Sequence, residues 1–92
     1  MGCGKKIVLF GAGQYGIKAL ERFGRDAVEC FVDNSASKQG TFLEGKPVRG
    51  IRDIMPQIAG YHIVIATSYS PSVEKQLRGL GVTDYEIFEG EV

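Results

Sequence analysis

The segment with the clearest chemical potential is a glycine-rich turn, Gly11-Ala12-Gly13-Gln14-Tyr15-Gly16. It directly follows an apolar run over 7–10 and precedes a helical pattern, which is the setting of the first turn of a dinucleotide-binding βαβ unit. The first glycine allows a tight turn, the second lets the main chain approach a phosphate, and the third lets the helix lie close to the strand. The N–H groups at the start of the helix would then face that phosphate. A plain strand-to-helix turn without a ligand gives the same pattern, so both interpretations stay open.

An acidic residue at the end of the second predicted strand is the next candidate. Asp33 lies about 20 residues beyond the turn, where dinucleotide-binding domains use a carboxylate to accept hydrogen bonds from a ribose. The sequence Asp33-Asn34-Ser35 is equally typical of a loop or a helix cap. No arginine follows and Lys38 is the nearest cation, so NAD is favoured over NADP if the ligand is a nicotinamide dinucleotide.

The sequence offers no recognisable catalytic group. His62 is the only histidine, and a lone histidine at a strand start, without an acidic or nucleophilic neighbour, is more often structural than catalytic. Ser68 and Ser70 have no histidine on a loop at the same rim, and no cluster of His, Cys, Asp and Glu has metal-ligand spacing. Tyr15 either stacks on a ligand or packs on the neighbouring loop. We therefore predict a ligand site with no catalytic residue and no metal, and whether the protein is an enzyme stays open.

The composition indicates one soluble domain covering residues 1–92, with 43% hydrophobic and 24% charged residues. Eleven basic and eleven acidic residues cancel, which argues against nucleic acid or an anionic membrane as a partner. The apolar runs are too short for membrane insertion, and the first residues do not form a signal peptide. Cys30 is expected to pack as a small hydrophobe, and neither it nor Cys3 indicates a disulfide framework. We expect a cytoplasmic domain with free thiols.

Alternating strand and helix patterns position the candidate residues. The patterns predict strands over 6–10, 28–32, 46–48, 61–66 and 85–88, and helices over 14–23, 51–58 and 71–79. Pro56 is expected to interrupt the second helix, and Ser70 is expected to cap the third. Glu74 and Arg78 are expected to pair across one turn of that helix. Residues 34–50 are polar and rich in glycine, so a turn and a short edge strand are expected there in place of a full crossover helix.

This order of elements predicts an α/β fold, namely a Rossmann-like three-layer αβα sandwich with a parallel sheet of about five strands. Right-handed crossovers give the spatial strand order 3-2-1-4-5, with the topological switch point between the first and fourth strands. A ligand is expected at that point. The predicted ligand-binding residues are Gly11, Ala12, Gly13, Gln14, Tyr15, Gly16, Asp33, Asn34, Thr67 and Ser68.

Five short segments follow a recurring order, namely FGAGQYG at 10–16, FVDN at 31–34, KQG at 38–40, GKPV at 45–48 and IVIAT at 63–67. Together they resemble the small Rossmann-like module at the N-terminus of bacterial sugar O- and N-acyltransferases of the sialic-acid and bacillosamine pathways. Similar modules are attached to polysaccharide-biosynthesis epimerases, to glycosyltransferases and to FkbM-type methyltransferases. The resemblance covers nearly the whole chain.

The resemblance implies a nucleotide-sugar pocket at the positions Gly11, Gly13, Gly16, Asp33 and Asn34. The catalytic histidine and the acyl-CoA site of the acyltransferases lie in a left-handed β-helix domain, which this chain does not contain. Gln14-Tyr15 also replaces the Gly-His common in their turn. Three functions stay open: a module that holds a UDP-sugar for the catalytic domain of a parent transferase in cell-surface polysaccharide biosynthesis, an NAD-binding domain of a truncated oxidoreductase or epimerase, or a ligand-free docking domain.

Overall fold

Strand β1 (Lys6–Phe10) lies at the centre of the sheet in the computed structural model, which describes residues 5–88. It pairs in parallel with β2 (Val28–Val32) on one side and with β5 (Tyr61–Ile65) on the other. All three strands have the positions expected from their apolar runs, except that β5 ends one residue earlier. The last three residues of each strand are buried and apolar without interruption, because helices cover both faces of the sheet.

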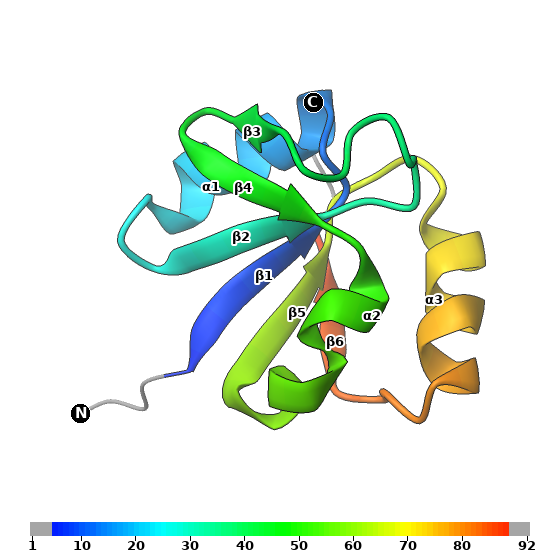
Figure 1. The fold of residues 1–92 in the computed structure, drawn as a ribbon. Helices are drawn as coiled ribbons and strands as arrows, with labels where there is room; N and C mark the ends of the chain where they lie inside the picture. Colours follow the sequence, from blue (N-terminus) through cyan, green and yellow to red (C-terminus); the bar gives the residue numbers. More distant parts are fainter. Residues whose placement is uncertain (1–4, 89–92) are drawn as a thin grey trace.

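The outer strands complete the sheet in the order β3-β4-β2-β1-β5-β6 (Figure 1). Strand β4 (Lys46–Arg49) pairs in parallel with β2, and β6 (Tyr85–Ile87) pairs in parallel with β5. The predicted order 3-2-1-4-5 is therefore confirmed for the five parallel strands. Strand β3 (Phe42–Leu43) is antiparallel to β4 and forms the outer edge, a strand that the sequence analysis missed. Two residues are too few for an alternating pattern to show.

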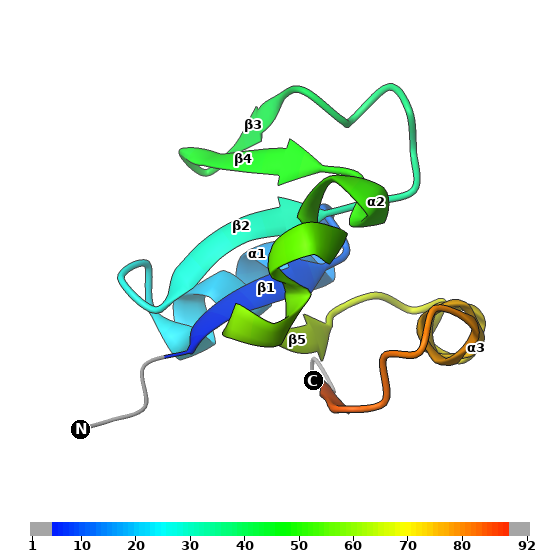
Figure 2. The ribbon, with the colours of Figure 1, turned by 60° about the horizontal axis from the view of Figure 1, so that its bottom comes forward.

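The helices lie on both faces of the sheet (Figure 2). Helix α1 (Gln14–Phe23) covers one face, while α2 (Ile51–Ile54), the 3₁₀ helix η1 (Met55–Gly60) and α3 (Ser70–Gly79) cover the other. The predicted helix over 51–58 is thus split, because Pro56 lacks an N–H and its ring cannot continue the α-helical turn. A three-layer αβα arrangement results.

The prediction of a serine cap on α3 is wrong. Ser70 is already inside the helix and makes no side-chain cap hydrogen bond. The carbonyl of Tyr69 accepts the first helical hydrogen bonds, from the N–H groups of Ser72 at 3.1 Å and Val73 at 3.2 Å. The helix therefore begins one residue earlier than expected, and Pro71 still lies in its first turn, where no N–H is needed.

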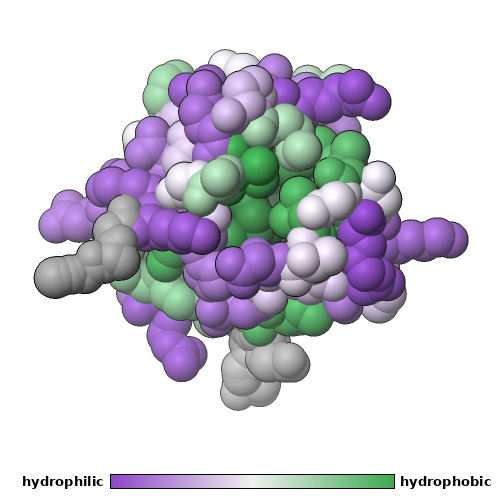
Figure 3. Space-filling view, turned by 90° about the horizontal axis from the view of Figure 1, so that it is seen from below, coloured by the Kyte–Doolittle hydropathy of each residue, from purple (hydrophilic) through white to green (hydrophobic). Residues whose placement is uncertain are grey.

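The core has one layer on each face of the sheet. Alternate residues of the central strands divide between them, so that Val8 and Phe10 pack toward α2 and α3 while Leu9 packs toward α1. Cys30 is buried in the first of these layers, as expected for a small hydrophobe. Figure 3 shows hydrophobic residues around a hollow on the side where η1 and the end of α3 lie. Partly buried apolar side chains pack against the core layer that faces α2 and α3, namely Met55, Ile58, Tyr61, Leu80, Val82, Tyr85 and Ile87.

Polar side chains pair within α3 and also link this helix to the sheet. Within the helix, Arg78 Nη1 lies 3.6 Å from Glu74 Oε1, so the expected pair is confirmed. The hydroxyl of Tyr85 accepts a hydrogen bond from Arg78 at 2.9 Å and donates one to Glu74 at 3.0 Å, which joins α3 to β6. Across residues 5–88, no helix is both long and apolar enough to traverse a bilayer.

Candidate functional site

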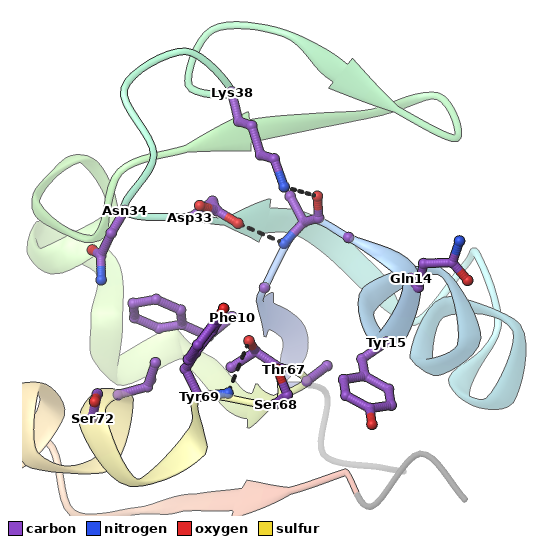
Figure 4. Close-up of a pocket in the computed structure, with 15 residues that line it drawn as sticks. Phe10, Gln14, Tyr15, Asp33, Asn34, Lys38, Thr67, Ser68, Tyr69 and Ser72 are labelled. Carbon is purple, nitrogen blue, oxygen red and sulfur yellow. Dashed lines mark hydrogen bonds between the residues drawn. The ribbon is translucent and has the colours of Figure 1, made fainter. Parts of the chain in front are cut away.

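A cavity of about 540 Å³ opens at the carboxyl ends of β1, β2 and β5 (Figure 4). Three segments that are distant in sequence line it: the glycine turn after β1, the loop after β2 and the loop between β5 and α3. All the predicted site residues except Gly16 lie in its wall. The structure thus brings them together at the expected switch point, while their role in binding stays a prediction.

An added Cβ would meet different surroundings at each of the three glycines of the turn. Gly11 has a φ of +133°, and a Cβ on it would collide with the carbonyl oxygen of Ala66. A Cβ on Gly16 would collide with the carbonyl oxygen of Gly11 and lie 3.0 Å from Cε1 of Phe31, so this buried glycine lets α1 approach the sheet. At Gly13 the nearest atom to such a Cβ is Lys38 Nζ, 3.9 Å away. The space in front of Gly13 is therefore open to a ligand.

Residues with acceptor-free backbone N–H groups line this space. The N–H of Gly11 donates to the carbonyl of Val32 at 2.7 Å and closes the turn onto β2. The N–H groups of Gly13, Gln14 and Tyr15 have no hydrogen-bond acceptor among residues 5–88, as is usual for the first turn of a helix. All three residues line the cavity. Together with the positive end of the α1 dipole they favour an anionic group here.

Asp33 holds the glycine turn in place through its side chain. Its Oδ2 accepts a hydrogen bond from the N–H of Ala12 at 2.9 Å, and its Oδ1 accepts one from the N–H of Ser35 at 2.8 Å. The loop-capping interpretation of the sequence is therefore correct. It does not exclude the other interpretation, because each carboxylate oxygen can accept a second hydrogen bond, for example from a ribose hydroxyl.

Asn34 connects the loop after β2 to α3. Its Nδ2 donates to Oε1 of Gln76 at 2.8 Å, and Nε2 of Gln76 donates back to Oδ1 of Asn34 at 3.1 Å. This reciprocal amide pair joins the two sides of the cavity. On the third segment, Oγ1 of Thr67 accepts a hydrogen bond from the N–H of Tyr69 at 3.3 Å.

Aromatic rings make up part of the wall, and the sequence analysis placed only one of them. Tyr15 was named as a site residue; Phe10 was not expected, and Tyr69 lies in the loop over 67–70, where a ligand was expected, but was not named (Figure 4). Of the two tyrosines that line the cavity, Tyr69 has 73% of its surface exposed and Tyr15 has 38%. The position of Tyr69 directly after Thr67-Ser68 was the available signal. The other residues that were missed are Lys38, Ala66, Ser72 and Val73.

Lys38 is the missed residue with the clearest chemical role. The sequence identified it as the cation nearest to Asp33 but did not include it in the site. In the structure its side chain turns back over the glycine turn, and Nζ donates a hydrogen bond to the carbonyl of Ala12 at 3.0 Å (Figure 4). No spacing rule would have found this contact, because it depends on how the loop over 33–41 folds.

His62 lies away from the cavity, at the start of β5. The expectation that it has no acidic neighbour is wrong, since its Nε2 lies 2.7 Å from Oε1 of Glu86 on the adjacent strand β6. The pair joins two strands at the surface and does not reach the glycine turn. Within residues 5–88, no group of three or more His, Cys, Asp or Glu side chains could hold a metal ion.

Comparison with known proteins shows a similarity to solved structures. No protein-family model matches the sequence, and no curated protein matches it either. Among solved structures, the chain is similar to UDP-D-quinovosamine 4-dehydrogenase from Vibrio fischeri, with a TM-score of 0.66 and 16% sequence identity. The similarity covers 92% of this chain and 76% of that one. At this identity the similarity establishes the Rossmann-like fold.

Proposed function

We propose that this chain is a nucleotide-binding module, and that its ligand is a nucleotide-sugar of the UDP-sugar type. The observation that carries the proposal is the cavity at the switch point, whose wall contains both the carboxylate-bearing Asp33 and three residues with acceptor-free N–H groups, Gly13, Gln14 and Tyr15. Open α/β sheets bind ligands at this place, and the helix start suits a phosphate. One solved structure that the chain resembles is that of an enzyme named for a UDP-sugar, which favours the same ligand class.

The module would act by holding its ligand for a catalytic domain. Phosphates would lie against the glycine turn, a ribose hydroxyl would donate to Asp33, and the rings of Tyr15 and Tyr69 would contact the flat or apolar parts of the ligand. A cavity of about 540 Å³ has the size of an ordinary small-molecule site. Positioning of this kind lowers a reaction barrier without a reacting group in the module. We place the parent enzyme, like the sugar transferases that the sequence resembles, in cell-surface polysaccharide biosynthesis.

NAD is the second candidate ligand. Asp33 favours it, because its carboxylate lies at the end of β2 where dinucleotide-binding domains hold the ribose. The size of the sheet favours a UDP-sugar over NAD. A complete dinucleotide site uses two halves with six parallel strands, whereas residues 5–88 supply five.

An amide NMR titration separates these candidates. The ¹⁵N-labelled chain is titrated in parallel with UDP, UDP-N-acetylglucosamine, NAD and acetyl-CoA, with Gly13→Val as the control variant. We expect shifts at 11–16, 33–34 and 67–69 with the UDP compounds, and none with Gly13→Val, because the added side chain fills the phosphate position. Shifts with NAD alone would select the second candidate. No shift with any ligand at millimolar concentration would contradict nucleotide binding and favour a docking domain.

A further inference from the structure

We infer that Lys38 binds the phosphate next to the ribose of the ligand, so that the site requires a nucleoside phosphate and rejects the nucleoside. This inference rests on the proposed function and adds the group that the ligand must carry. It also assigns a specificity-determining role to a residue outside the glycine turn.

Charge is the first argument. Lys38 is the single cation among the residues that line the cavity, and within residues 5–88 it forms no ion pair with a carboxylate. An ammonium group carries three donors, and the one hydrogen bond to Ala12 uses only one of them. Two donors of the ammonium group therefore remain available at the wall of the cavity, beside the open space in front of Gly13.

The fold fixes where this charge lies. The N–H of Lys38 donates to the carbonyl of Ser35 at 3.0 Å, and its carbonyl accepts hydrogen bonds from Thr41, from the N–H at 3.1 Å and from Oγ1 at 2.5 Å. The N–H of Gly40 donates to the carbonyl of Val48 at 2.9 Å, which ties the loop to β4. The main chain at Lys38 is thus held by the loop and by β4, and only the side chain has to move to contact a ligand.

The contact partner of Lys38 indicates which phosphate it reaches. Lys38 and Asp33 come from the same loop and converge on the same residue, with Asp33 on the N–H of Ala12 and Lys38 on its carbonyl (Figure 4). Asp33 marks the ribose side of the site in the proposed function. The ammonium group therefore lies beside the phosphate attached to the ribose, and more distal phosphates extend along the N–H groups at the start of α1.

A structural latch is the competing explanation, since the contact between Lys38 and Ala12 also joins the loop to the glycine turn. The two explanations differ in their measurable effects. A latch predicts that removing the ammonium group affects stability, and that it affects all ligands equally. Phosphate binding predicts a loss confined to ligands that carry a phosphate.

The test compares Lys38→Met with Lys6→Met, using uridine, UMP and UDP as probes in calorimetric or NMR titrations. Lys6 is a matched control, because it is also exposed and donates to a backbone carbonyl, that of Asp26 at 2.7 Å, but at the opposite end of β1. For Lys38→Met we expect the affinities for UMP and UDP to fall by about tenfold or more, which is the usual effect of losing a charge-assisted hydrogen bond. Uridine should bind the variant and the unmodified chain equally weakly. Lys6→Met should match the unmodified chain throughout.

The outcomes are distinguishable. Equal affinities of Lys38→Met and the unmodified chain for UMP and UDP would overturn the inference while leaving the proposed function intact. A loss of affinity for uridine as large as that for UMP and UDP would do the same. A loss for UDP but not for UMP would overturn the assignment to the ribose-linked phosphate. If the unmodified chain binds neither UMP nor UDP, the proposed function itself fails, and this inference fails with it. Circular dichroism of both variants shows that they are folded.

Discussion

Replacing single glycines of the turn by alanine should separate folding from binding. Gly16→Ala places a Cβ against the carbonyl oxygen of Gly11 and 3.0 Å from Cε1 of Phe31. Helix α1 would have to move away from the sheet, although Ala19 and Leu20 on the same helix are 0% and 3% exposed. Overpacking of this kind costs about 1–3 kcal/mol. In a domain of this size that corresponds to a fall in Tm of roughly 5–20 °C.

Gly13→Ala is the matched comparison. Its φ of −141° suits any residue, and the new Cβ would meet only Lys38 Nζ, 3.9 Å away. We expect its free energy of unfolding to stay within about 1 kcal/mol of the unmodified chain. Binding of UDP should nevertheless weaken, because the methyl group occupies the approach to the phosphate. Urea unfolding followed by circular dichroism measures the first effect, and titration measures the second. Equal stability of the two variants would refute the assignment of Gly16 to packing and Gly13 to ligand approach.

Three further predictions concern other contacts. Asp33→Ala removes the acceptor of two backbone N–H groups and should lower the free energy of unfolding by about 1–3 kcal/mol, with a smaller loss for Asp33→Asn. Urea unfolding measures this loss, and an unchanged free energy of unfolding would contradict the role of Asp33 in holding the turn. Tyr85→Phe removes the hydroxyl between α3 and β6 and should cost about 0.5–1.5 kcal/mol in the same assay, whereas an unchanged midpoint would show that water replaces it. Burial raises the pKa of the Cys30 thiol, so in a Cys3→Ser variant iodoacetamide should alkylate the folded chain at least about tenfold more slowly than the urea-unfolded chain. Because the unfolded chain loses this proton at lower pH, stability should also fall as the pH rises above about 8.5, and pH-independent stability there would contradict the shift.

Much of the fold follows from local patterns in the sequence. The apolar run that ends at Phe10 is long enough to form only one buried strand, and the glycine turn after it fixes where α1 begins. With helices on both faces of the sheet, the right-handed crossover rule then gives the strand order. Local patterns did not predict strand β3, because two residues are too few to show alternation. They also placed the start of α3 one residue too late, because the carbonyl of Tyr69, in place of the side chain of Ser70, begins the helix.

The site could be predicted as far as its residues follow the strand ends. Asp33 comes directly after β2 and Thr67 is the second residue after β5, and all parallel strands end at the same edge, so their meeting was foreseeable. Lys38 lies five residues beyond Asp33, and Tyr69 lies two residues beyond Thr67. Their positions depend on turn hydrogen bonds such as that from Lys38 to Ser35, and on the place where α3 begins, which no residue spacing encodes.

The two hydrogen bonds to the main chain of Ala12 affect how fast the site can bind a ligand. Its N–H and its carbonyl are both bound, so the two successive peptide planes on either side of this residue cannot rotate freely. A turn that already has its bound shape loses little conformational entropy when a ligand arrives, and it need not wait for a rare open state. Ligand capture by such a turn is governed by encounter and by the exchange of one lysine contact. Under the proposed function, the turn can therefore accept a phosphate without first changing its shape.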